Sequence, residues 1–364
     1  MEVKMSDYFI SQIQPTDRIG LAKIDALLSQ EDLQREAHLD YTCAMYDSDG
    51  HIIATGSCFG STLRCLAVSK AHQGEGLLNE ILTHLIEVQY ARGNVRLFLY
   101  AKMKSAVFFE DLGFYEIARV DDVLVFMENR RNGFADYLKA LALATDTALP
   151  GMPLCPQKKV PNSAALVMNA NPFTLGHQYL VETAAARCDV LHLFLLSEDT
   201  SLIPFSVRKN LALKGIAHLP NVICHDSGPY IISKATFPGY FLKEEEAVIQ
   251  SHAKLDLAVF TKIAKALSIT SRYVGDEPYS QVTRIYNQIM ADKLPAVGIN
   301  CVIVPRKESD GCPISASRVR QYLKEQNFSA VTGLVPKSTL DYFQSDEALP
   351  VIERISRSED VVHY

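Results

Sequence analysis

The sequence predicts an α/β protein of two parts: an N-terminal α+β domain and a C-terminal domain built on a parallel sheet. Three observations predict this fold class. From residue 162 onward, short apolar runs of strand length alternate with amphipathic stretches of helix length, as in parallel sheets with crossover helices. A proline-rich segment, residues 149–161, separates this part from the first third of the chain. With 364 residues, the chain is also too long for one ordinary hydrophobic core.

The composition is that of a globular protein with a mildly acidic surface. Hydrophobic residues make up 48% of the chain and the formal net charge is −6 at pH 7, which argues against a protein that coats nucleic acid. The eight cysteines form no C-x-x-C pair, so neither a zinc knuckle nor a disulfide framework is expected. No apolar run approaches the roughly 18 residues of a membrane span, and Glu2, Lys4 and Asp7 interrupt the N-terminus. We therefore expect a cytoplasmic protein with neither nucleic-acid nor membrane partners.

The first domain, expected over residues 1–130, contains a Gly-x-Gly turn before an amphipathic helix. Its predicted elements are the strand 63–68, the turn 71–76, the helix 77–91, the strand 95–100 and the segment 105–114. Gly74 and Gly76 lie in the turn before the helix. This order resembles the GCN5-related N-acetyltransferase family. The resemblance implies that Gly74 and Gly76 bind the pyrophosphate of coenzyme A.

Two departures from the acetyltransferase pattern argue against acetyl transfer by this domain. The pattern has Arg or Gln three residues before the first glycine, where this chain has Ala71, and the tyrosine of the late helix is replaced by Phe108 or Phe109. We expect recognition instead, because a fold shaped for coenzyme A suits a dephospho-coenzyme A group attached to a partner protein. Two alternatives stay open: a domain that only packs as a scaffold, and a working acetyltransferase that uses acetyl-coenzyme A.

Residues 131–161 are expected to connect the two domains. A helix at 134–144 leads into the stretch 149–161, where four prolines and one glycine favour a stiff, extended connector. The second domain is then expected over residues 162–335. A charged C-terminal tail, either packed or loose, spans residues 336–364.

The second domain alternates buried strands with amphipathic helices. Strands are expected at 164–168, 190–196, 221–224, 269–274 and 299–304, and helices at 174–187, 206–219, 255–267 and 280–291, with a last one ending near Glu325. This alternation predicts a parallel, Rossmann-like sheet, whose ligands bind beyond the carboxyl ends of the strands. Polar turns follow these strands, so we expect the turns to share one cleft.

The turn after the first of these strands is expected to hold phosphate groups. Its candidate ligand contacts are Asn169, Asn171, Phe173, Thr174, Gly176 and His177. Thr174 is a natural N-cap, and the free N–H groups of the first helical turn attract an anion. Gly176 costs the helix about 1 kcal/mol relative to alanine, which fits a ligand close to the backbone. His177 is placed to donate to a phosphate oxygen as charge builds on it. Taken alone, the turn is equally well explained as an ordinary connection between a strand and a helix.

A second motif follows the last strand, at residues 311–320. Ser315 or Ser317 is expected to cap the next helix. Together with Ile314 and Arg320, these serines would offer hydroxyls, backbone N–H groups and a guanidinium to one polyphosphate. An ordinary serine-capped surface helix explains the motif on its own. Thr-x-Gly-His after the first strand and Ile-Ser-x-Ser-x-x-Arg after the last are, as a pair, more specific than either.

The pair resembles the nucleotidyltransferase superfamily, and further segments narrow the resemblance to the [citrate (pro-3S)-lyase] ligase family. The segments that carry it are 169–174, 233–238, 272–278 and 314–317. The resemblance covers nearly the whole chain. It implies an acid–thiol ligase that uses ATP with Mg²⁺, activates acetate as acetyl-AMP and releases pyrophosphate. The acetyl group would then pass to the thiol of the prosthetic group on the acyl carrier subunit of citrate lyase.

The resemblance also implies roles for individual residues. His177, Ser317 and Arg320 would be catalytic, and the four residues expected near adenine and ribose, at the end of the fourth strand, are Arg272, Gly275, Asp276 and Glu277. Asp276 or Glu277 is equally explained as a helix cap. Arg208 is placed to reach the triphosphate, although an exposed helical arginine is the simpler interpretation.

The implied reaction does not require a general base from the protein in its first step. A carboxylate is already ionised at pH 7, so its attack on the α-phosphorus needs no general base, and catalysis should rest on positioning and charge stabilisation. Mg²⁺ is expected to neutralise the triphosphate, and no residue is assigned as a metal ligand. Two other functions stay open: an adenylyltransferase acting on a phosphorylated metabolite such as 4′-phosphopantetheine, and a non-catalytic module that binds a carrier protein.

Overall fold

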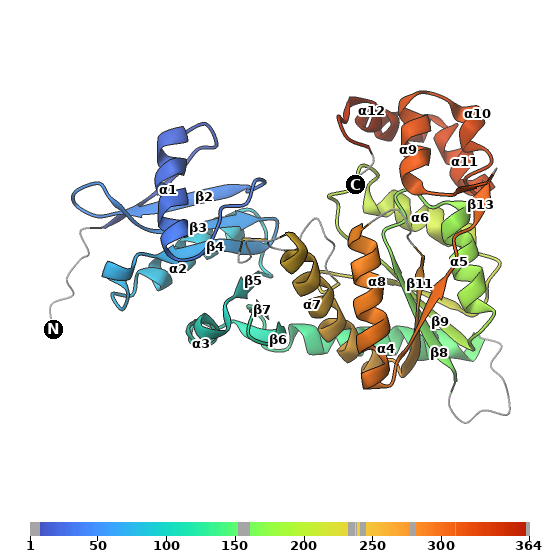
Figure 1. The fold of residues 1–364 in the computed structure, drawn as a ribbon, viewed down its shortest axis with the longest axis horizontal. Helices are drawn as coiled ribbons and strands as arrows, with labels where there is room; N and C mark the ends of the chain where they lie inside the picture. The colour runs from blue at the N-terminus through green and yellow to red at the C-terminus, as the bar shows by residue number, and fades with distance from the viewer. Residues whose placement is uncertain are drawn as a thin grey trace. The chain divides into compact units, whose positions relative to one another are not determined.

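A computed structural model describes the chain at residues 8–151, 161–231, 237, 239–240, 245–276, 281–309 and 311–361. The chain forms two compact units (Figure 1). Unit 1 contains Met1–Phe134 and Pro238–Ser251, and unit 2 contains Ala135–Phe237 and His252–Tyr364. The chain therefore returns to unit 1 for a short segment, which the linear division made from the sequence does not include.

Unit 1 is built on a seven-stranded sheet. Its elements are β1 (Phe9–Gln12), α1 (Arg18–Gln30), β2 (Tyr41–Tyr46), β3 (Ile52–Phe59), β4 (Thr62–Val68), η1 (Lys70–His72), α2 (Leu77–Ala91), β5 (Phe98–Ala101), α3 (Met103–Asp111), β6 (Tyr115–Val120) and β7 (Leu124–Glu128). The strand order is β1-β2-β3-β4-β5-β7-β6. All neighbouring strands are antiparallel except β4 and β5.

The parallel strands β4 and β5 are hydrogen-bonded at their beginnings and separate further along. β4 and β5 are paired at Thr62 with Phe98 and at Leu63 with Leu99, and the later residues of both strands line a cavity instead. A mixed sheet with one parallel pair that opens in its middle is the acetyltransferase-like α+β fold that the sequence predicts. The apolar face of α2 packs on this sheet through Ile81, Leu82 and Leu85.

The elements from residue 133 onward form the parallel sheet, a short two-stranded antiparallel sheet and the helices around them. They are α4 (Gly133–Ala148), η2 (Leu149–Gly151), β8 (Ser163–Met168), α5 (Leu175–Ala185), β9 (Val190–Leu195), α6 (Phe205–Ile216), β10 (Val222–Asp226), α7 (Glu245–Ala266), β11 (Ile269–Gly275), α8 (Gln281–Lys293), η3 (Pro295–Val297), β12 (Asn300–Val304), β13 (Glu308–Ser309), β14 (Cys312–Pro313), α9 (Ala316–Lys324), α10 (Phe328–Val331), α11 (Lys337–Phe343), η4 (Asp346–Ala348) and α12 (Leu349–Arg357).

The five-stranded sheet of unit 2 is parallel throughout, with the order β10-β9-β8-β11-β12. This confirms the predicted Rossmann-like sheet. The chain builds β8, β9 and β10 toward one edge and then places β11 and β12 on the other side of β8. The strand order therefore reverses between β8 and β11, and the carboxyl ends at such a reversal are where ligands of these sheets bind.

The C-terminal residues pack as helices. Leu323 of α9, Val331 of α10, Phe343 of α11 and Ile355 of α12 belong to one buried cluster, which also contains Ile203. The segment after residue 336, a charged tail in the sequence, thus contributes two helices to the core of unit 2 (Figure 1).

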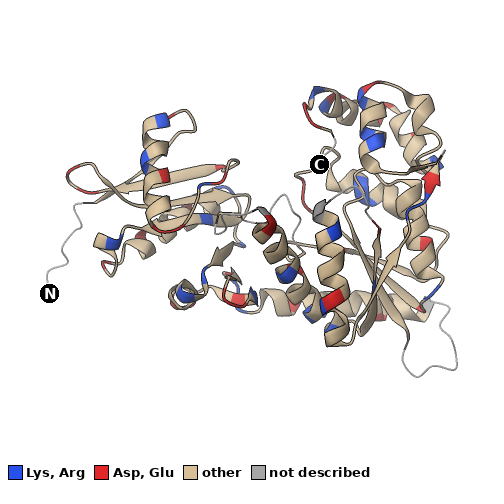
Figure 2. Cartoon of the chain, in the orientation of Figure 1, with Lys and Arg blue, Asp and Glu red and all other residues tan. Residues whose placement is uncertain are grey.

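Charged residues of both signs are distributed over the helices of each unit (Figure 2). This mixed pattern agrees with the small net charge of the chain. Among the described residues, we find no helix with the length and apolar character that crossing a membrane requires.

Two histidines form a buried pair in the parallel sheet. His192 on β9 and His225 on β10 are almost completely buried, and Nδ1 of His192 lies 3.0 Å from Nε2 of His225. Burial lowers the pKa of His192 to about 3, with His225 adding to the effect. Burial likewise lowers the pKa of His225 to about 4, against the opposing charge of Asp226. Both rings are therefore neutral at pH 7, where one nitrogen donates to the other.

This pair predicts a loss of stability in mild acid. In the unfolded chain the histidines titrate near pH 6.5, whereas the folded pair resists protonation. The stability is therefore complete above about pH 6.5, and each histidine removes about 1.4 kcal/mol per pH unit as the pH falls toward the folded pKa values. We expect the midpoint of thermal unfolding to drop steeply between pH 6.5 and pH 4.5. His192→Phe/His225→Phe should flatten this dependence, and an unchanged slope in the double variant would contradict the assignment.

Candidate active site

The turn after β8 orients its histidine through a capped helix. Thr174 is the N-cap of α5: its Oγ1 accepts a hydrogen bond from the backbone N–H of His177 at 3.3 Å. In return, the backbone N–H of Thr174 donates to Nδ1 of His177 at 3.1 Å. This reciprocal arrangement is a capping box in which histidine takes the place of the usual Glu or Gln. The predicted N-cap is confirmed, and the imidazole is held by the helix that it begins.

The capping box also determines the tautomer of His177. A backbone N–H can only donate, so Nδ1 must be the unprotonated nitrogen, and the ring proton resides on Nε2. Burial, together with the positive charges of Arg306 and Arg320, lowers the pKa of His177 to about 4. At neutral pH the side chain is therefore a neutral imidazole whose Nε2–H is a hydrogen-bond donor.

The ring of His177 is supported by Phe173. The two rings lie 5.8 Å apart with an interplanar angle of 22°, and Phe173 is completely buried. A side chain at Gly215 of α6 would meet the Phe173 ring at 2.4 Å, so this glycine makes room for it. Phe173 is thus part of the packing beneath the histidine.

The two motifs found in the sequence lie against each other. A Cβ added at Gly176 would be 3.1 Å from the carbonyl oxygen of Ile314, and the backbone N–H of Leu175 donates to the carbonyl of Leu334 at 2.9 Å. A guanidinium nitrogen of Arg320, on α9, donates to the carbonyl oxygen of Asn171. The close approach of the backbones at Gly176 gives a packing reason for a glycine in the first turn of α5.

The structure shows which of the two candidate serines caps α9. Ser315 is the N-cap, because its Oγ accepts from the backbone N–H of Arg318 at 3.2 Å. The hydroxyls of Ser315 and Ser317 lie 3.0 Å apart. Both serines are partly exposed, so the N-terminus of α9 presents one capping hydroxyl and one further hydroxyl beside the turn of α5.

Arg320 is buried within the site. Its side chain is 2% exposed, and Nε donates to the carbonyl oxygen of Val361 at 2.6 Å. Burial lowers the pKa of Arg320 to about 10, so the guanidinium stays charged at neutral pH. The charge lies next to Asn171 and raises the local positive potential around His177.

Arg208 has a different environment from the one expected from the sequence. Its side chain is fully buried, not exposed on α6. Its guanidinium donates five hydrogen bonds of 2.6–3.0 Å to oxygens of four residues: Asn169, Leu196, Glu198 and Ile203. These acceptors lie just beyond β8 and β9 and in the segment before α6, so Arg208 ties the strand ends together. We assign it a positioning role.

The end of β11 contains a second buried arginine and the exposed Asp276. Arg272 is 4% exposed and pairs with Asp256 of α7 at 3.0 Å. Its guanidinium lies 4.2 Å from the centre of the Phe260 ring. Burial opposes its charge, but Asp256 outweighs that effect and the pKa of Arg272 is raised. Arg272 therefore anchors β11 on α7.

Asp276 is linked to the last strand and to a basic residue that the sequence analysis did not single out as a site residue. The backbone N–H of Asp276 donates to the carbonyl oxygen of Val304 at 2.8 Å. The carbonyl oxygen of Asp276 accepts a hydrogen bond from Nε of Arg306, also at 2.8 Å. The positive charge of Arg306 also lowers the pKa of His177. Arg306 therefore lies near Asp276 and near His177. The pattern that could have identified it is the basic pair Arg306-Lys307 directly after β12.

Unit 1 contains a separate cavity of about 570 Å³ between the open ends of β4 and β5. Gly74 and Gly76, which have φ angles of 90° and 84°, lie at its exposed side. These positive φ angles favour glycine. Gly76 is the N-cap of α2 and provides no side-chain acceptor. The first residues of α2 thus lie at the exposed side of a largely apolar cavity.

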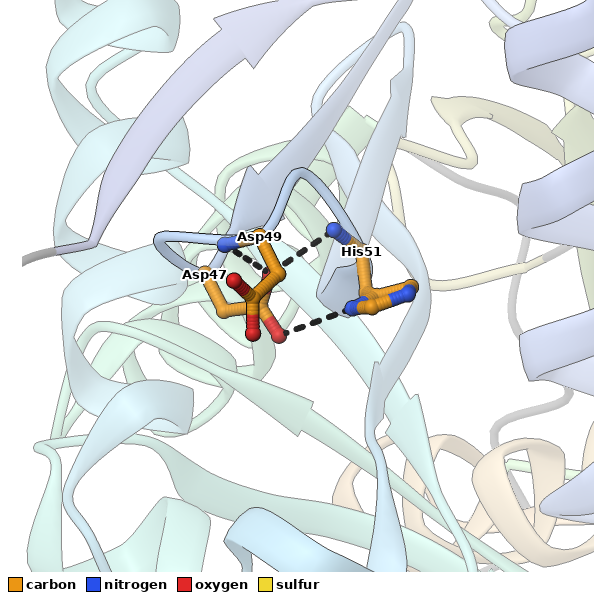
Figure 3. Close-up of side chains that lie close together, drawn as sticks. All are labelled: Asp47, Asp49 and His51. Carbon is orange, nitrogen blue, oxygen red and sulfur yellow. Dashed lines mark hydrogen bonds and ion pairs between the residues drawn. The ribbon is translucent and has the colours of Figure 1, made fainter.

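A cluster of Asp47, Asp49 and His51 lies in the turn between β2 and β3 (Figure 3). Oδ1 of Asp47 accepts the backbone N–H groups of Asp49 at 3.0 Å and His51 at 2.8 Å. Oδ2 of Asp47 lies 3.3 Å from Nδ1 of His51. These contacts stabilise the turn, and they explain the grouping without a metal ion.

Sequence comparisons identify the family. A sequence model of the citrate lyase ligase C-terminal domain matches residues 163–343. The [citrate [pro-3S]-lyase] ligase of Klebsiella pneumoniae is 41% identical over 324 residues, which cover 88% of this chain and 91% of the relative. The chain belongs to the citrate lyase ligase family. The [citrate [pro-3S]-lyase] ligase of Escherichia coli (strain K12) is 37% identical over 341 residues, covering 92% of this chain and 93% of that one.

Solved structures are similar to about a third of the chain. Escherichia coli ElaA is 13% identical with a TM-score of 0.30, and covers 35% of this chain and 100% of its own. The ribosomal-protein-S18-alanine N-acetyltransferase of Escherichia coli is 21% identical with a TM-score of 0.26, and covers 33% of this chain and 92% of its own. The acetyltransferase-like fold of unit 1 is assigned from its strand order and its one parallel strand pair.

In this member of the citrate lyase ligase family, the predicted residues fall into distinct groups. The turn of α5 and the start of α9 come together, with Asn171, Thr174, Gly176, His177, Ile314, Ser315, Ser317 and Arg320. Gly275 and Asp276 lie at the carboxyl end of β11. Asn169, Phe173, Arg208 and Arg272 make side-chain contacts with neighbouring residues of unit 2, and the nucleotide contacts expected of them stay predictions. Gly74 and Gly76 belong to unit 1. Glu277 and residues 233–236 lie outside the described residues.

Proposed function

We propose that the protein is an ATP-dependent acid–thiol ligase that activates citrate lyase. It converts acetate to acetyl-AMP and acetylates the thiol of the dephospho-coenzyme A-derived group on the acyl carrier subunit of citrate lyase. The observation that carries the proposal is the convergence of a neutral His177 with the N-termini of α5 and α9 beyond parallel strands. The names and the extensive coverage of the relatives support the same activity.

In the first step, a carboxylate oxygen of acetate attacks the α-phosphorus of ATP. The bond from this phosphorus to the bridging oxygen breaks, and pyrophosphate leaves. Because acetate is ionised, no group has to accept a proton. His177 needs only to donate its Nε2–H to a phosphate oxygen, where negative charge increases in the transition state. A neutral donor with a pKa near 4 suits this role over the physiological pH range.

The start of α9 and the neighbouring arginines complete the phosphate environment. Ser317 and the free N–H groups of α9 donate to phosphate oxygens, and Arg306 and Arg320 supply positive charge. Asn171 supports this arrangement, because its buried Nδ2 has no acceptor in the described part of the chain. A donor in this condition is expected where a ligand supplies the acceptor.

The adenosine end is assigned to the end of β11. A Cβ added at Gly275 would be 3.7 Å from Cδ2 of Leu180, and Asp276 is exposed at the carboxyl end of β11, beside the point where the strand order reverses. Mg²⁺ keeps several waters and binds chiefly through substrate phosphates, so no residue is assigned to it. Mg²⁺ would neutralise the charge of the triphosphate. Glu277, next in sequence, stays a predicted contact.

In the second step, the thiol sulfur of the carrier arm attacks the acyl carbon of acetyl-AMP. The bond from this carbon to the phosphate oxygen breaks, AMP leaves, and the thiol proton passes to solvent. Unit 1 would hold the arm. Its cavity offers apolar walls for the pantetheine chain and the N–H groups of Gly74, Gly76 and the start of α2 for the phosphate end.

Incubation of the purified protein with ATP, Mg²⁺, acetate and hydroxylamine tests the proposal. Acetyl hydroxamate and pyrophosphate should form in equal amounts, because hydroxylamine traps the activated acyl group. Formation of dephospho-coenzyme A from ATP and 4′-phosphopantetheine, with no hydroxamate, would identify an adenylyltransferase instead. Carrier binding without either product would identify a non-catalytic module. Both of these results contradict the ligase.

A further inference from the structure

A residue from far along the chain forms part of the cavity of unit 1. Tyr240 belongs to the segment that returns to this unit, and it lines the cavity together with β4 and β5. Its side chain is 4% exposed. Oη of Tyr240 donates to the carbonyl oxygen of Tyr100 at 3.2 Å. This carbonyl belongs to β5 beyond its last pair with β4, so the phenol hydroxyl bonds to the strand where the sheet has opened.

The backbone of this segment is fixed as well. The carbonyl oxygen of Tyr240 accepts from the backbone N–H of Gln34 at 3.0 Å. The N–H of Gly239 donates to Oε1 of Glu36 at 3.0 Å, and the other carboxylate oxygen of Glu36 is paired with Arg64. The tyrosine ring packs in a buried cluster with Leu33, Cys65 and Ala67. Contacts of both its ring and its backbone therefore fix Tyr240 in the lining of the cavity.

The cavity is bordered by exposed residues on the α2 side and on α3, where Phe108 is 61% exposed, and by buried residues of the opened sheet. Gln73, Gly74 and Asn79 on the α2 side are exposed, whereas Ala67, Tyr100 and Tyr240 are at most 5% exposed. A linear ligand that enters with its phosphate end at α2 would thus have its far end next to the tyrosine ring. The space available at that end depends on the size of residue 240.

We propose that Tyr240 closes the inner end of the cavity and sets its depth, so that the cavity takes a thiol or an acetyl group on a pantetheine-type arm and excludes longer acyl chains. This inference rests on the proposed role of unit 1 in holding the carrier arm. It makes Tyr240 a residue that determines specificity in that unit.

Calorimetric titration of the full-length protein with coenzyme A, acetyl-, butyryl- and hexanoyl-coenzyme A tests the inference. The wild type should bind the first two with similar Kd and hexanoyl-coenzyme A at least about 10-fold more weakly. Tyr240→Ala should improve the binding of hexanoyl- relative to acetyl-coenzyme A by about 10-fold or more, an effect that fewer than two newly buried methylene groups would produce. Tyr240→Phe keeps the ring and should keep the wild-type order.

Matched variants make each outcome decisive. Tyr90→Ala, at a half-exposed position of α2, should not change the chain-length order. If Tyr240→Ala fails to fold by circular dichroism, Tyr240→Leu decides, since its smaller side chain should admit butyryl-coenzyme A several-fold better than the wild type. Equal chain-length profiles in the wild type and the folded variants would overturn the inference alone. No binding of any of these ligands by the wild type would also overturn the arm-holding role, while hydroxamate formation would still report separately on acetate activation.

Discussion

His177→Ala is expected to lower kcat for acetyl hydroxamate formation by about 10²–10³-fold, the typical effect of removing one donor that stabilises transition-state charge. The KM for ATP should change much less, because the Nε2–H contact strengthens mainly as charge develops on the phosphate. The measurement is steady-state kinetics at saturating acetate. His218→Ala, which removes a half-exposed histidine paired with Glu182, is the matched control and should retain the wild-type rate.

The protonation state of His177 gives this prediction a second readout. With a pKa of about 4, the side chain does not titrate between pH 8 and pH 5.5, so the rate should show no ionisation of His177 in that range. An acid limb near pH 6.5 in the wild type that disappears in His177→Ala would show an imidazole acting as a base or as a cation. Such a profile would contradict the neutral-donor role, as would a loss of less than about 10-fold in kcat.

Much of the fold follows from local rules in the sequence. Helix α2 has the predicted bounds, and the strands of the parallel sheet lie within one or two residues of their predicted positions, because apolar runs and turn residues specify them locally. Thr174 is recognisable as a cap because its side chain bonds within its own helical turn. Helix α7 begins ten residues earlier than expected, at Glu245 instead of residue 255. Acidic residues favour a helix N-terminus, and an interpretation based on apolar spacing does not weigh them.

The remaining features depend on contacts between distant parts of the chain. Tyr240 reaches β5 across a separation of 140 residues, and nothing local in its sequence indicates that partner. The basic pair Arg306-Lys307 is visible in the sequence, but the contact of Arg306 with Asp276 is apparent only once β11 and β12 are adjacent. Gly176 has a structural reason in the carbonyl of Ile314, which is likewise a long-range contact. Sequence motifs therefore located the two halves of the candidate site, while the contacts that join these halves required the folded chain.

Arg208→Met is expected to destabilise unit 2 by about 3–5 kcal/mol, the range found when one partner of a buried charged network is removed. Methionine fills part of the space but leaves the carbonyl oxygens of Leu196, Glu198 and Ile203 without this donor. Buried acceptors that lose their donors carry most of the cost. For a unit of this size the midpoint of thermal unfolding should fall by about 10 °C.

The adjacent position supplies the matched control for Arg208. Lys209 is partly exposed and pairs with Asp226 on the surface, so Lys209→Ala should cost less than about 1 kcal/mol. Arg208 also donates to the backbone and side-chain oxygens of Asn169, at the start of the turn that leads to His177. Without these hydrogen bonds the turn loses a fixed position, so the folded fraction of Arg208→Met should show a raised KM for ATP. A variant with wild-type stability and a large loss of kcat would instead place Arg208 directly on the triphosphate.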